Sequence, residues 1–257
     1  MRSSKPSIAE LRPIVHPPGL LARRSAEHWA GRWYMRRLSV YATWILVRTG
    51  LSANAVTGLM IVVGLVGAAA ISTGGIAGAA AGVVLIQVYL LLDCSDGEVA
   101  RWRETQSMTG VYLDRLGHYL VEASILVALG ARAGSWDAPW LAAGLAAGML
   151  VMLEKAETDL VDVARHRAGR SPALDESAVM RSPALARGRR LAGYLPLHRV
   201  THAVEASLLI LVAAVVSEAT DSIRPTRALM VAMLAVTALT AVLHLVSVLS
   251  SSRLRDA

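Results

Sequence analysis

Residues 92–122 read LDCSDGEVARWRETQSMTGVYLDRLGHYLVE, and this segment decides the fold because it sets acidic residues beside long apolar runs. Read as helix, it places Asp93 and Asp96 one turn apart on one face. Asp114 and His118 are spaced in the same way and would share one face of a second helix. Carboxylates that converge beside a membrane repel one another unless a hard divalent cation binds between them. The spacing therefore predicts a metal-dependent phosphate site on two helices.

The predicted metal ligands are the three aspartates, Asp93, Asp96 and Asp114. Small residues share the same helical faces, where they allow helix backbones and a bulky ligand to approach closely. These small residues are Gly97, Ala100 and Gly110. The segment thus combines charged ligand groups with room for a large substrate.

The order of these residues resembles the motif of the CDP-alcohol phosphotransferase family, also called CDP-alcohol phosphatidyltransferases. That motif reads D-x2-D-G-x2-A-R-x8-G-x3-D-x3-D. All fixed positions except the last are matched, by Asp93, Asp96, Gly97, Ala100, Arg101, Gly110 and Asp114. At the last position, where the family has an aspartate, this chain has His118.

The resemblance implies a transferase that moves a substituted phosphate from a CDP-linked donor to an alcohol and releases CMP. It implies Mg²⁺ or Mn²⁺ bound by the three aspartates, and CDP bound by Gly97, Ala100, Arg101 and Gly110. His118 would stand in for the family's last aspartate as the base, beside Asp114. A neutral histidine can act as a base or help to bind metal, so both roles are open. Arg101 could equally form a structural ion pair.

Composition indicates an integral membrane protein, because 54% of the 257 residues are hydrophobic and several apolar runs are long enough to span a bilayer. We expect an all-α polytopic protein with six transmembrane helices, preceded by an interfacial amphipathic helix. Residues 1–19 would form a loosely ordered polar tail and residues 20–50 the interfacial helix. Residues 51–252 would form the catalytic domain, with a basic loop at about 159–195.

Apolar runs and cap-type residues give the expected boundaries of the six spans. The first would begin at the cap residues Ser52 and Asn54 and end near residue 72. The second and third would cover about 75–103 and 107–133, and the fourth would follow a short turn and end near residue 158. The last two would cover about 196–217 and 227–250. Asn54 and Thr57 would either contact the nucleotide or only serve the start of the first span.

Basic residues predict the orientation, since all but three of the 26 Lys and Arg residues would lie on one side of such a bundle. The exceptions are Arg132, Arg224 and Arg227. Cytoplasmic segments are enriched in Lys and Arg, so both termini and the aspartates should face the cytoplasm of a cell membrane. The net charge of +7 then suits anionic lipid better than nucleic acid. The single cysteine, Cys94, excludes an internal disulfide.

The acceptor is predicted from charges near the fifth span. Arg199 and His202 are candidate ligands of a phosphorylated polyol, such as inositol phosphate or glycerol phosphate, because ionisable groups in a spanning helix usually serve a function. Most arginines of the preceding loop are better explained by the positive-inside rule. A homodimer is compatible with the sequence.

Two other classes of function compete with the enzyme. Loss of the fourth aspartate would suit a family member that binds CDP-alcohols as a membrane scaffold without turnover. A transporter would also have six spans, but it would need polar residues near the middle of several helices. Here the charges gather at the cytoplasmic ends, which favours the enzyme.

Overall fold

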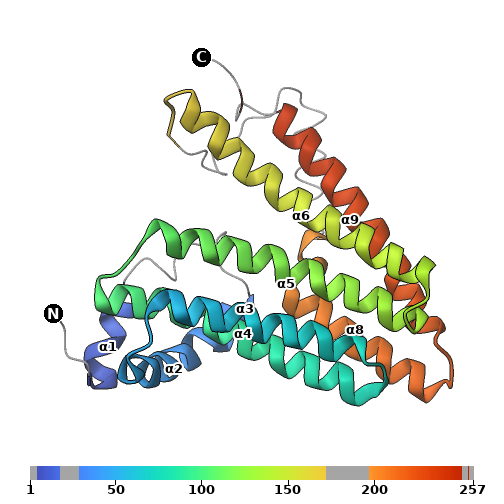
Figure 1. The fold of residues 1–257 in the computed structure, drawn as a ribbon, viewed down its shortest axis with the longest axis horizontal. Coiled ribbons are helices and arrows are strands. Elements are labelled where there is room, and N and C mark those ends of the chain that lie inside the picture. The colour runs from blue at the N-terminus through green and yellow to red at the C-terminus, as the bar shows by residue number, and fades with distance from the viewer. Residues whose placement is uncertain (1–4, 18–28, 172–196, 251–253, 255–257) are drawn as a thin grey trace. The chain divides into compact units, whose positions relative to one another are not determined.

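The computed structural model describes residues 5–17, 29–171, 197–250 and 254, and all regular structure among them is helical, as expected (Figure 1). The helices are α1 Ile8–Val15, α2 Arg36–Thr49, α3 Ala53–Ser72, α4 Gly75–Arg103, α5 Met108–Gly134, α6 Ala138–Arg167, α8 Ala203–Ala219 and α9 Arg224–Ser250. A π-helical turn, Gly31–Met35, leads into α2, and a 3₁₀ turn, Leu197–Thr201, precedes α8.

Three helices of the described chain, α3, α4 and α9, are long and apolar enough to cross a membrane. This confirms a membrane protein. Helices α5, α6 and α8 coincide with the other expected spans, but α5 and α6 interrupt their apolar runs with charges such as Glu122 and Lys155. Helix α8 has only 17 residues, below the roughly 20 that a straight span needs. Six spans therefore stay a prediction.

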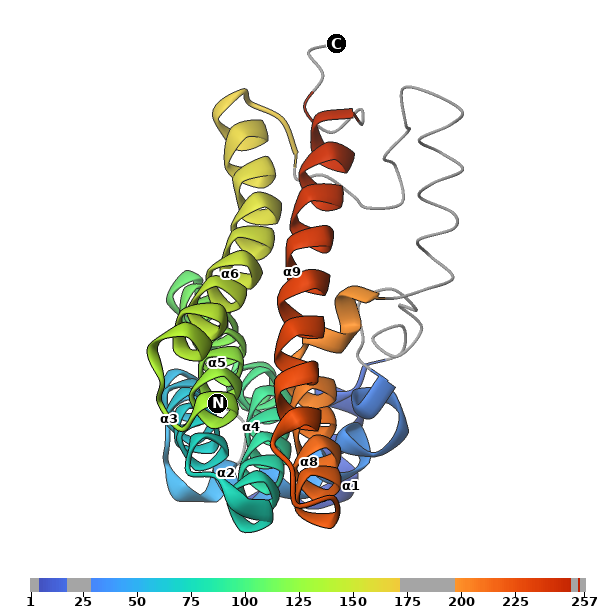
Figure 2. The same cartoon turned by 90° about the vertical axis from the view of Figure 1, so that its right-hand side faces the viewer.

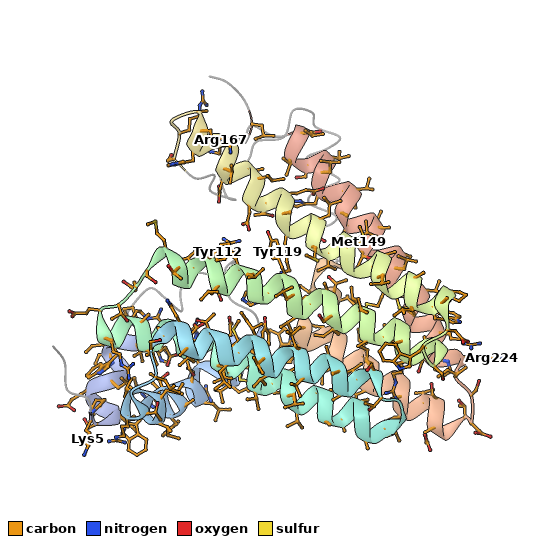
Figure 3. The ribbon with its side chains drawn as sticks, viewed as in Figure 1. Lys5, Tyr112, Tyr119, Met149, Arg167 and Arg224 are labelled. Carbon is orange, nitrogen blue, oxygen red and sulfur yellow. The ribbon has the colours of Figure 1, made fainter. Side chains whose placement is uncertain are left out.

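Large apolar side chains cover the outer surfaces of several helices, as a lipid environment requires. Val84 on α4 is 61% exposed, and Tyr112 on α5 is 66% exposed. Met149 on α6 is 71% exposed and, like Tyr112, projects from its helix in Figure 3. In water such surfaces would be costly, whereas acyl chains cover them without loss.

The described chain divides into two compact units, and the first comprises Met1–Ala70 and Ala80–Val121. Within it α1 and α2 pack on the end of α4, around a core formed by Leu11, Val15, Val40, Val47, Ala53, Val99 and Trp102. Helices α3 and α4 approach closely at Gly67, where an added Cβ would lie 3.1 Å from Leu85 Cβ. This packing fixes the end of α4 that carries the aspartates.

The expected polar tail contains a helix that the sequence analysis did not anticipate. Helix α1 begins at a capping box in which the Ser7 hydroxyl accepts from the Glu10 N–H, and the Glu10 carboxylate accepts from the Ser7 N–H. A capping box satisfies two otherwise unpaired donors and so starts a helix. Pro13 lies inside α1. Prolines in the tail had indicated irregular chain, yet they do not prevent this short helix.

The expected interfacial helix is described only from residue 29 onward. Trp33 lies in the π-helical turn, is 71% exposed and packs edge to face with Trp29, with ring centroids 6.3 Å apart. Farther along, the Arg48 guanidinium lies 3.5 Å from the Trp44 ring centroid. An exposed indole such as that of Trp33 is typical of a helix at headgroup depth, whereas Trp44 is partly buried against the core of α1, α2 and α4. The interfacial position itself stays a prediction.

The second unit comprises Ile71–Ala79 and Glu122–Ala257. Helices α5 and α6 touch through small residues, and a Cβ added at Gly144 would lie 2.8 Å from the Leu126 carbonyl oxygen. Helices α6 and α9 run side by side in Figures 1 and 2. His244 joins them, since its Nδ1 lies 2.8 Å from an oxygen of Glu157. Helix α6 continues to Arg167, beyond the expected end of its span.

Candidate functional site

The first unit carries the predicted metal ligands on two consecutive helices, near the end of α4 and the start of α5. Helix α4 ends where Glu104 adopts a left-handed φ of 57°, which is a common helix stop. Helix α5 begins after Ser107, whose hydroxyl accepts a 3.0 Å hydrogen bond from the Gly110 N–H. The short turn brings the two helices alongside each other (Figure 1).

Three of the predicted residues converge between these helices. Nε2 of His118 lies 3.1 Å from Oδ1 of Asp93 and 3.5 Å from Oδ1 of Asp114. One potential ligand atom from each residue lies within 4.8 Å of the other two. Ligands about 2.1 Å from a shared cation lie roughly 3 to 4 Å apart, so the group needs little adjustment to bind a divalent ion. The donor set fits the metal that the sequence predicted.

Asp96 lies outside this group of three, although it was predicted as a metal ligand beside Asp93. Its side chain is 8% exposed, and Oδ2 accepts a 2.6 Å hydrogen bond from the Thr57 hydroxyl. Oδ1 accepts from the N–H of Gly97 at 2.5 Å. The carboxylate is therefore held in one orientation by α3 and by its own helix. Thr57, which was expected to contact the nucleotide or to serve the start of the first span, therefore hydrogen-bonds to Asp96.

Tyr89 is a site residue that the sequence analysis missed. Its hydroxyl lies 2.7 Å from Nδ1 of His118, and the two rings meet edge to face at 86°. Only 2% of Tyr89 is exposed. A Cβ at Gly64 would lie 2.9 Å from the Tyr89 ring, so this glycine makes room for it. The available signal was its position one turn before Asp93 on α4.

The predicted CDP-binding residues have separate surroundings. An added Cβ at Gly97 would lie 3.3 Å from Nη1 of Arg101, whose Nε donates to the Val15 carbonyl oxygen at 3.1 Å. Ala100 packs on the core that α1 and α2 share with α4. A Cβ at Gly110 would lie 3.1 Å from Oδ1 of Asn54. The backbones of both glycines thus adjoin polar side chains.

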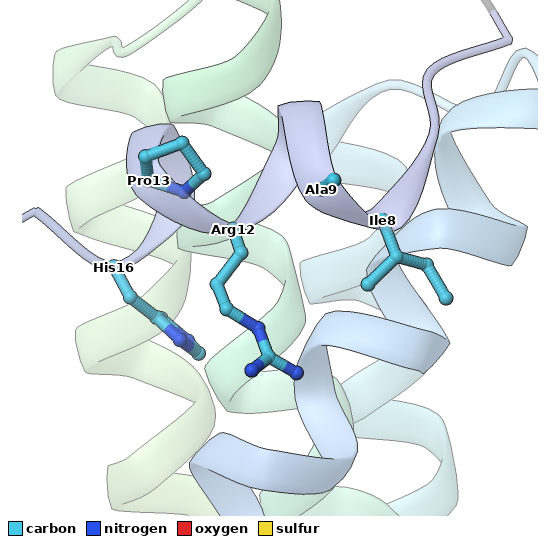
Figure 4. A pocket seen from close by; sticks show the side chains of 5 residues that line it. All are labelled: Ile8, Ala9, Arg12, Pro13 and His16. Atoms are coloured by element: carbon cyan, nitrogen blue, oxygen red, sulfur yellow. The ribbon is translucent and has the colours of Figure 1, made fainter.

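Glu98, inside the aspartate motif, was also missed, and it is fully buried. Its carboxylate accepts hydrogen bonds from the hydroxyls of Ser39 at 2.5 Å and Thr43 at 2.8 Å, both on α2. Nε2 of His16 lies 2.8 Å from it and Nη1 of Arg36 lies 3.5 Å from it. His16 projects from α1 on the same side as Arg12 (Figure 4). Glu98 thereby ties α1 and α2 to the helix that carries Asp93 and Asp96.

The predicted acceptor residues lie in the second unit. Arg199 is exposed, and Nδ1 of His202 lies 3.7 Å from the Glu122 carboxylate. The same carboxylate, 5% exposed, forms a 3.1 Å ion pair with Lys155. The basic loop that precedes Arg199 falls mostly in residues 172–196, outside the described chain.

The sequence was also compared with those of known proteins. A family model described as CDP-alcohol phosphatidyltransferase matches residues 50–252, which is more than half of the chain and includes every predicted site residue. No curated protein matches the sequence.

Proposed function

The chain belongs to the CDP-alcohol phosphatidyltransferase family, and from this premise we propose that it transfers a substituted phosphate from CDP-diacylglycerol, or a similar CDP-alcohol, to an alcohol, with release of CMP. One observation carries the proposal, namely the convergence of Asp93, Asp114 and His118 inside the matched region. Apolar spans beside these residues favour a donor with acyl chains, which can arrive sideways from the lipid. The product then belongs to phospholipid biosynthesis.

The reaction needs one bond to form and one to break. The acceptor hydroxyl oxygen attacks the phosphorus that bears the alcohol, the bond from that phosphorus to the oxygen of CMP breaks, and the hydroxyl proton passes to a base on the protein. Nε2 of His118 has a single lone pair, so it can take this proton or bind metal, but not both at once. The second carboxylate oxygen of Asp114 is the alternative base.

Asp93 and Asp114 bind Mg²⁺ or Mn²⁺ in this proposal, and Asp96 completes the site from its position against Thr57. A divalent cation held there would supply positive charge that withdraws electron density from the pyrophosphate and stabilises the departing CMP. The chain's own task is to hold these carboxylates in place, which Thr57 does for Asp96 through its hydrogen bond. A fixed ligand geometry avoids reorganisation during the reaction.

The nucleotide contacts are assigned to the glycines and Arg101. In this proposal Gly97 and Gly110 leave backbone exposed to cytidine and its phosphates, beside the polar side chains of Arg101 and Asn54. Ala100, which packs on the core of α1, α2 and α4, keeps the neighbouring turn of α4 small. The terminal nitrogens of Arg101 can pair with a phosphate while its Nε keeps the Val15 carbonyl. Charge pairing of this kind positions a phosphate without taking part in bond formation.

The acceptor in this proposal is a phosphorylated polyol, such as inositol phosphate or glycerol phosphate. Arg199 supplies an exposed guanidinium, and His202 supplies an imidazole whose Nδ1 lies 3.7 Å from the Glu122 carboxylate. Substituting Arg199 by alanine should therefore raise the KM for the acceptor more than it changes kcat. An unchanged KM would remove Arg199 from the acceptor site.

The deciding experiment measures CMP release by purified full-length protein in lipid or detergent, with CDP-diacylglycerol and a panel of alcohols. We expect turnover that stops with a metal chelator and returns with Mg²⁺ or Mn²⁺. Asp93→Asn and Asp114→Asn should abolish it while the protein stays folded, because each removes a charged ligand without changing side-chain volume. Asp221→Asn, in the exposed turn before α9, is the matched control and should leave the rate unchanged.

Binding of CDP-diacylglycerol with no turnover of any alcohol would contradict the enzymatic proposal and favour a binding or scaffolding subunit. Turnover that survives Asp93→Asn would instead contradict the metal site while leaving the reaction in place.

A further inference from the structure

His118 stands at the position where the motif that this chain resembles ends in an aspartate, and the surroundings of its imidazole favour a specific role. We propose that Nε2 of His118 is a metal ligand, that Tyr89 orients it, and that the mixed nitrogen and oxygen site selects a first-row transition ion such as Mn²⁺ over Mg²⁺. The inference deepens the proposed function and rests on it, because that function supplies the divalent cation.

The first support is the direction of the imidazole. Nε2 points at the same oxygens that would bind the cation, Oδ1 of Asp93 at 3.1 Å and Oδ1 of Asp114 at 3.5 Å. All three residues belong to one compact unit and are partly buried, with side-chain exposures of 30%, 22% and 39% for His118, Asp93 and Asp114. An ion among these atoms therefore contacts Nε2 as directly as it contacts the carboxylates.

The second support is the partner on the other side of the ring. Tyr89 places its hydroxyl 2.7 Å from Nδ1, and burial of Tyr89 keeps that hydroxyl in place. A phenol can accept a hydrogen bond from Nδ1–H, which leaves the Nε2 lone pair free for a metal. Ligating histidines commonly donate their second N–H to a fixed partner, which sets the tautomer and the ring orientation. Tyr89 is such a positioning residue here.

The selectivity follows from the donor atoms. An aspartate at position 118 would add a further anionic oxygen to those of the other aspartates, the kind of ligand that Mg²⁺ prefers. Imidazole instead removes one negative charge and offers a softer nitrogen, which Mn²⁺, Fe²⁺, Co²⁺ and Zn²⁺ accept more readily than Mg²⁺. Replacing the carboxylate by His118 thus weakens Mg²⁺ binding more than transition-metal binding.

The test uses Mn²⁺ bound to the full-length protein, because its electron spin detects a coordinated nitrogen independently of activity. Pulsed electron paramagnetic resonance should show coupling to an imidazole ¹⁴N in the native protein and in His166→Gln, which removes an exposed histidine at the end of α6. His118→Asp should bind Mn²⁺ without that coupling. The Mg²⁺ concentration that displaces Mn²⁺ from His118→Asp should be at least about tenfold lower than the concentration that displaces it from the native protein.

Tyr89→Phe separates orientation from packing, since it removes only the hydroxyl. We expect Mn²⁺ affinity to fall about 10- to 100-fold, the usual cost of losing the partner of a ligating histidine, with the nitrogen coupling retained or shifted. Native-like affinity in Tyr89→Phe would overturn the role of Tyr89.

The remaining outcomes distinguish this inference from the proposed function. Mn²⁺ bound to the native protein without nitrogen coupling would overturn ligation by His118 and leave it as the proton acceptor, while metal-dependent CMP release would still support the enzyme. If neither the native protein nor His118→Asp binds Mn²⁺, both the ligation by His118 and the proposed metal-dependent function are overturned.

Discussion

Thr57 fixes the orientation of Asp96, because its hydroxyl donates a 2.6 Å hydrogen bond to a carboxylate that is almost fully buried. We predict that Thr57→Val, which has nearly the same shape, lowers the rate of CMP release about tenfold to a hundredfold. A hydrogen bond to a charged group contributes about 1.5 to 3 kcal/mol, and each 1.4 kcal/mol is a factor of ten.

Thr57→Ser retains the hydroxyl and is the matched control, so it should keep a rate close to native. A near-native rate in Thr57→Val, which keeps the methyl group and lacks only the hydroxyl, would show that the hydrogen bond does not set the rate, and the support for Asp96 would have to come from elsewhere.

Single residues also show what spacing can and cannot predict. Asp93, Asp114 and His118 were predictable as neighbours, since helical spacing puts each on a defined face and the family motif relates the two helices. The partners of these residues were not predictable. Tyr89, Thr57 and Glu98 act across helix contacts, and contacts between residues about 30 to 80 positions apart leave no periodic signal in one sequence.

Among the elements, α4 depends on a buried carboxylate that joins it to α1 and α2. Glu98 accepts from Ser39, Thr43 and His16, and a glutamine there would turn an NH₂ group toward donors that need an acceptor. We predict that Glu98→Gln lowers the free energy of unfolding by about 1 to 3 kcal/mol, the cost of leaving a buried polar group unsatisfied. The measurement is the thermal unfolding midpoint in detergent.

The control is Glu218→Gln on the exposed end of α8, which should change the midpoint little. An unchanged midpoint in Glu98→Gln would mean that α1 and α2 stay attached through their apolar core alone.

Helix α1 has a weak dependence on pH that follows from its capping box. The backbone N–H of Ser7, and then its hydroxyl, lower the pKa of the Glu10 carboxyl below its usual value. A lowered pKa means that the ionised carboxylate stabilises the helix, so this contribution is present above the unfolded pKa and is lost as pH falls through the folded pKa. Amide exchange in α1 should therefore accelerate below about pH 4.

Glu10→Gln should show the faster exchange already at neutral pH and little further change on acidification from this cap. Exchange in α1 that does not depend on pH in the native protein, after correction for the intrinsic rate, would remove the capping box as a stabilising feature.

Helix boundaries were predictable where a long apolar run ends in charged or turn residues. Helix α4 occupies Gly75–Arg103 and α5 occupies Met108–Gly134, within a residue or so of the expected spans. Helix α1 was not predictable because its capping box stands among prolines and the helix carries only two fully buried side chains, Leu11 and Val15. Helix α6 runs past the predicted end of its span to Arg167, because charges near the membrane surface continue a helix as readily as they end it.

At the scale of the whole chain, membrane class and helix content were predictable from composition and apolar run length, but the number of spans was not secured. Three helices qualify as spans on their own among the described residues. In α5 and α6 the buried charges Arg132 and Glu157 are paired within the protein, Arg132 with the Ile71 carbonyl oxygen and Glu157 with His244. Pairing reduces the free-energy cost of a charge in the bilayer, so a helix with low local hydropathy can still span the membrane when its charges are paired within the protein.

The orientation of the chain in its membrane can be read from the turns between its helices. If all six helices span it, the turns at Thr73 and Thr220 lie on one side and the turn at Gln106 lies on the other. Basic residues beside the Gln106 turn, Arg101 and Arg103, predict that this side faces the cytoplasm. Single cysteines at these exposed positions, in a Cys94→Ala background, should therefore react with an impermeant maleimide from outside at Thr73 and Thr220. The cysteine at Gln106 should react only after the membrane is opened. That result would place the Gln106 turn, and the aspartates near it, on the cytoplasmic side, where a water-soluble acceptor made in the cytoplasm can reach them. Labelling of Gln106→Cys in intact cells would reverse the orientation, and labelling of Thr73→Cys and Thr220→Cys from opposite sides would require an odd number of spans between them.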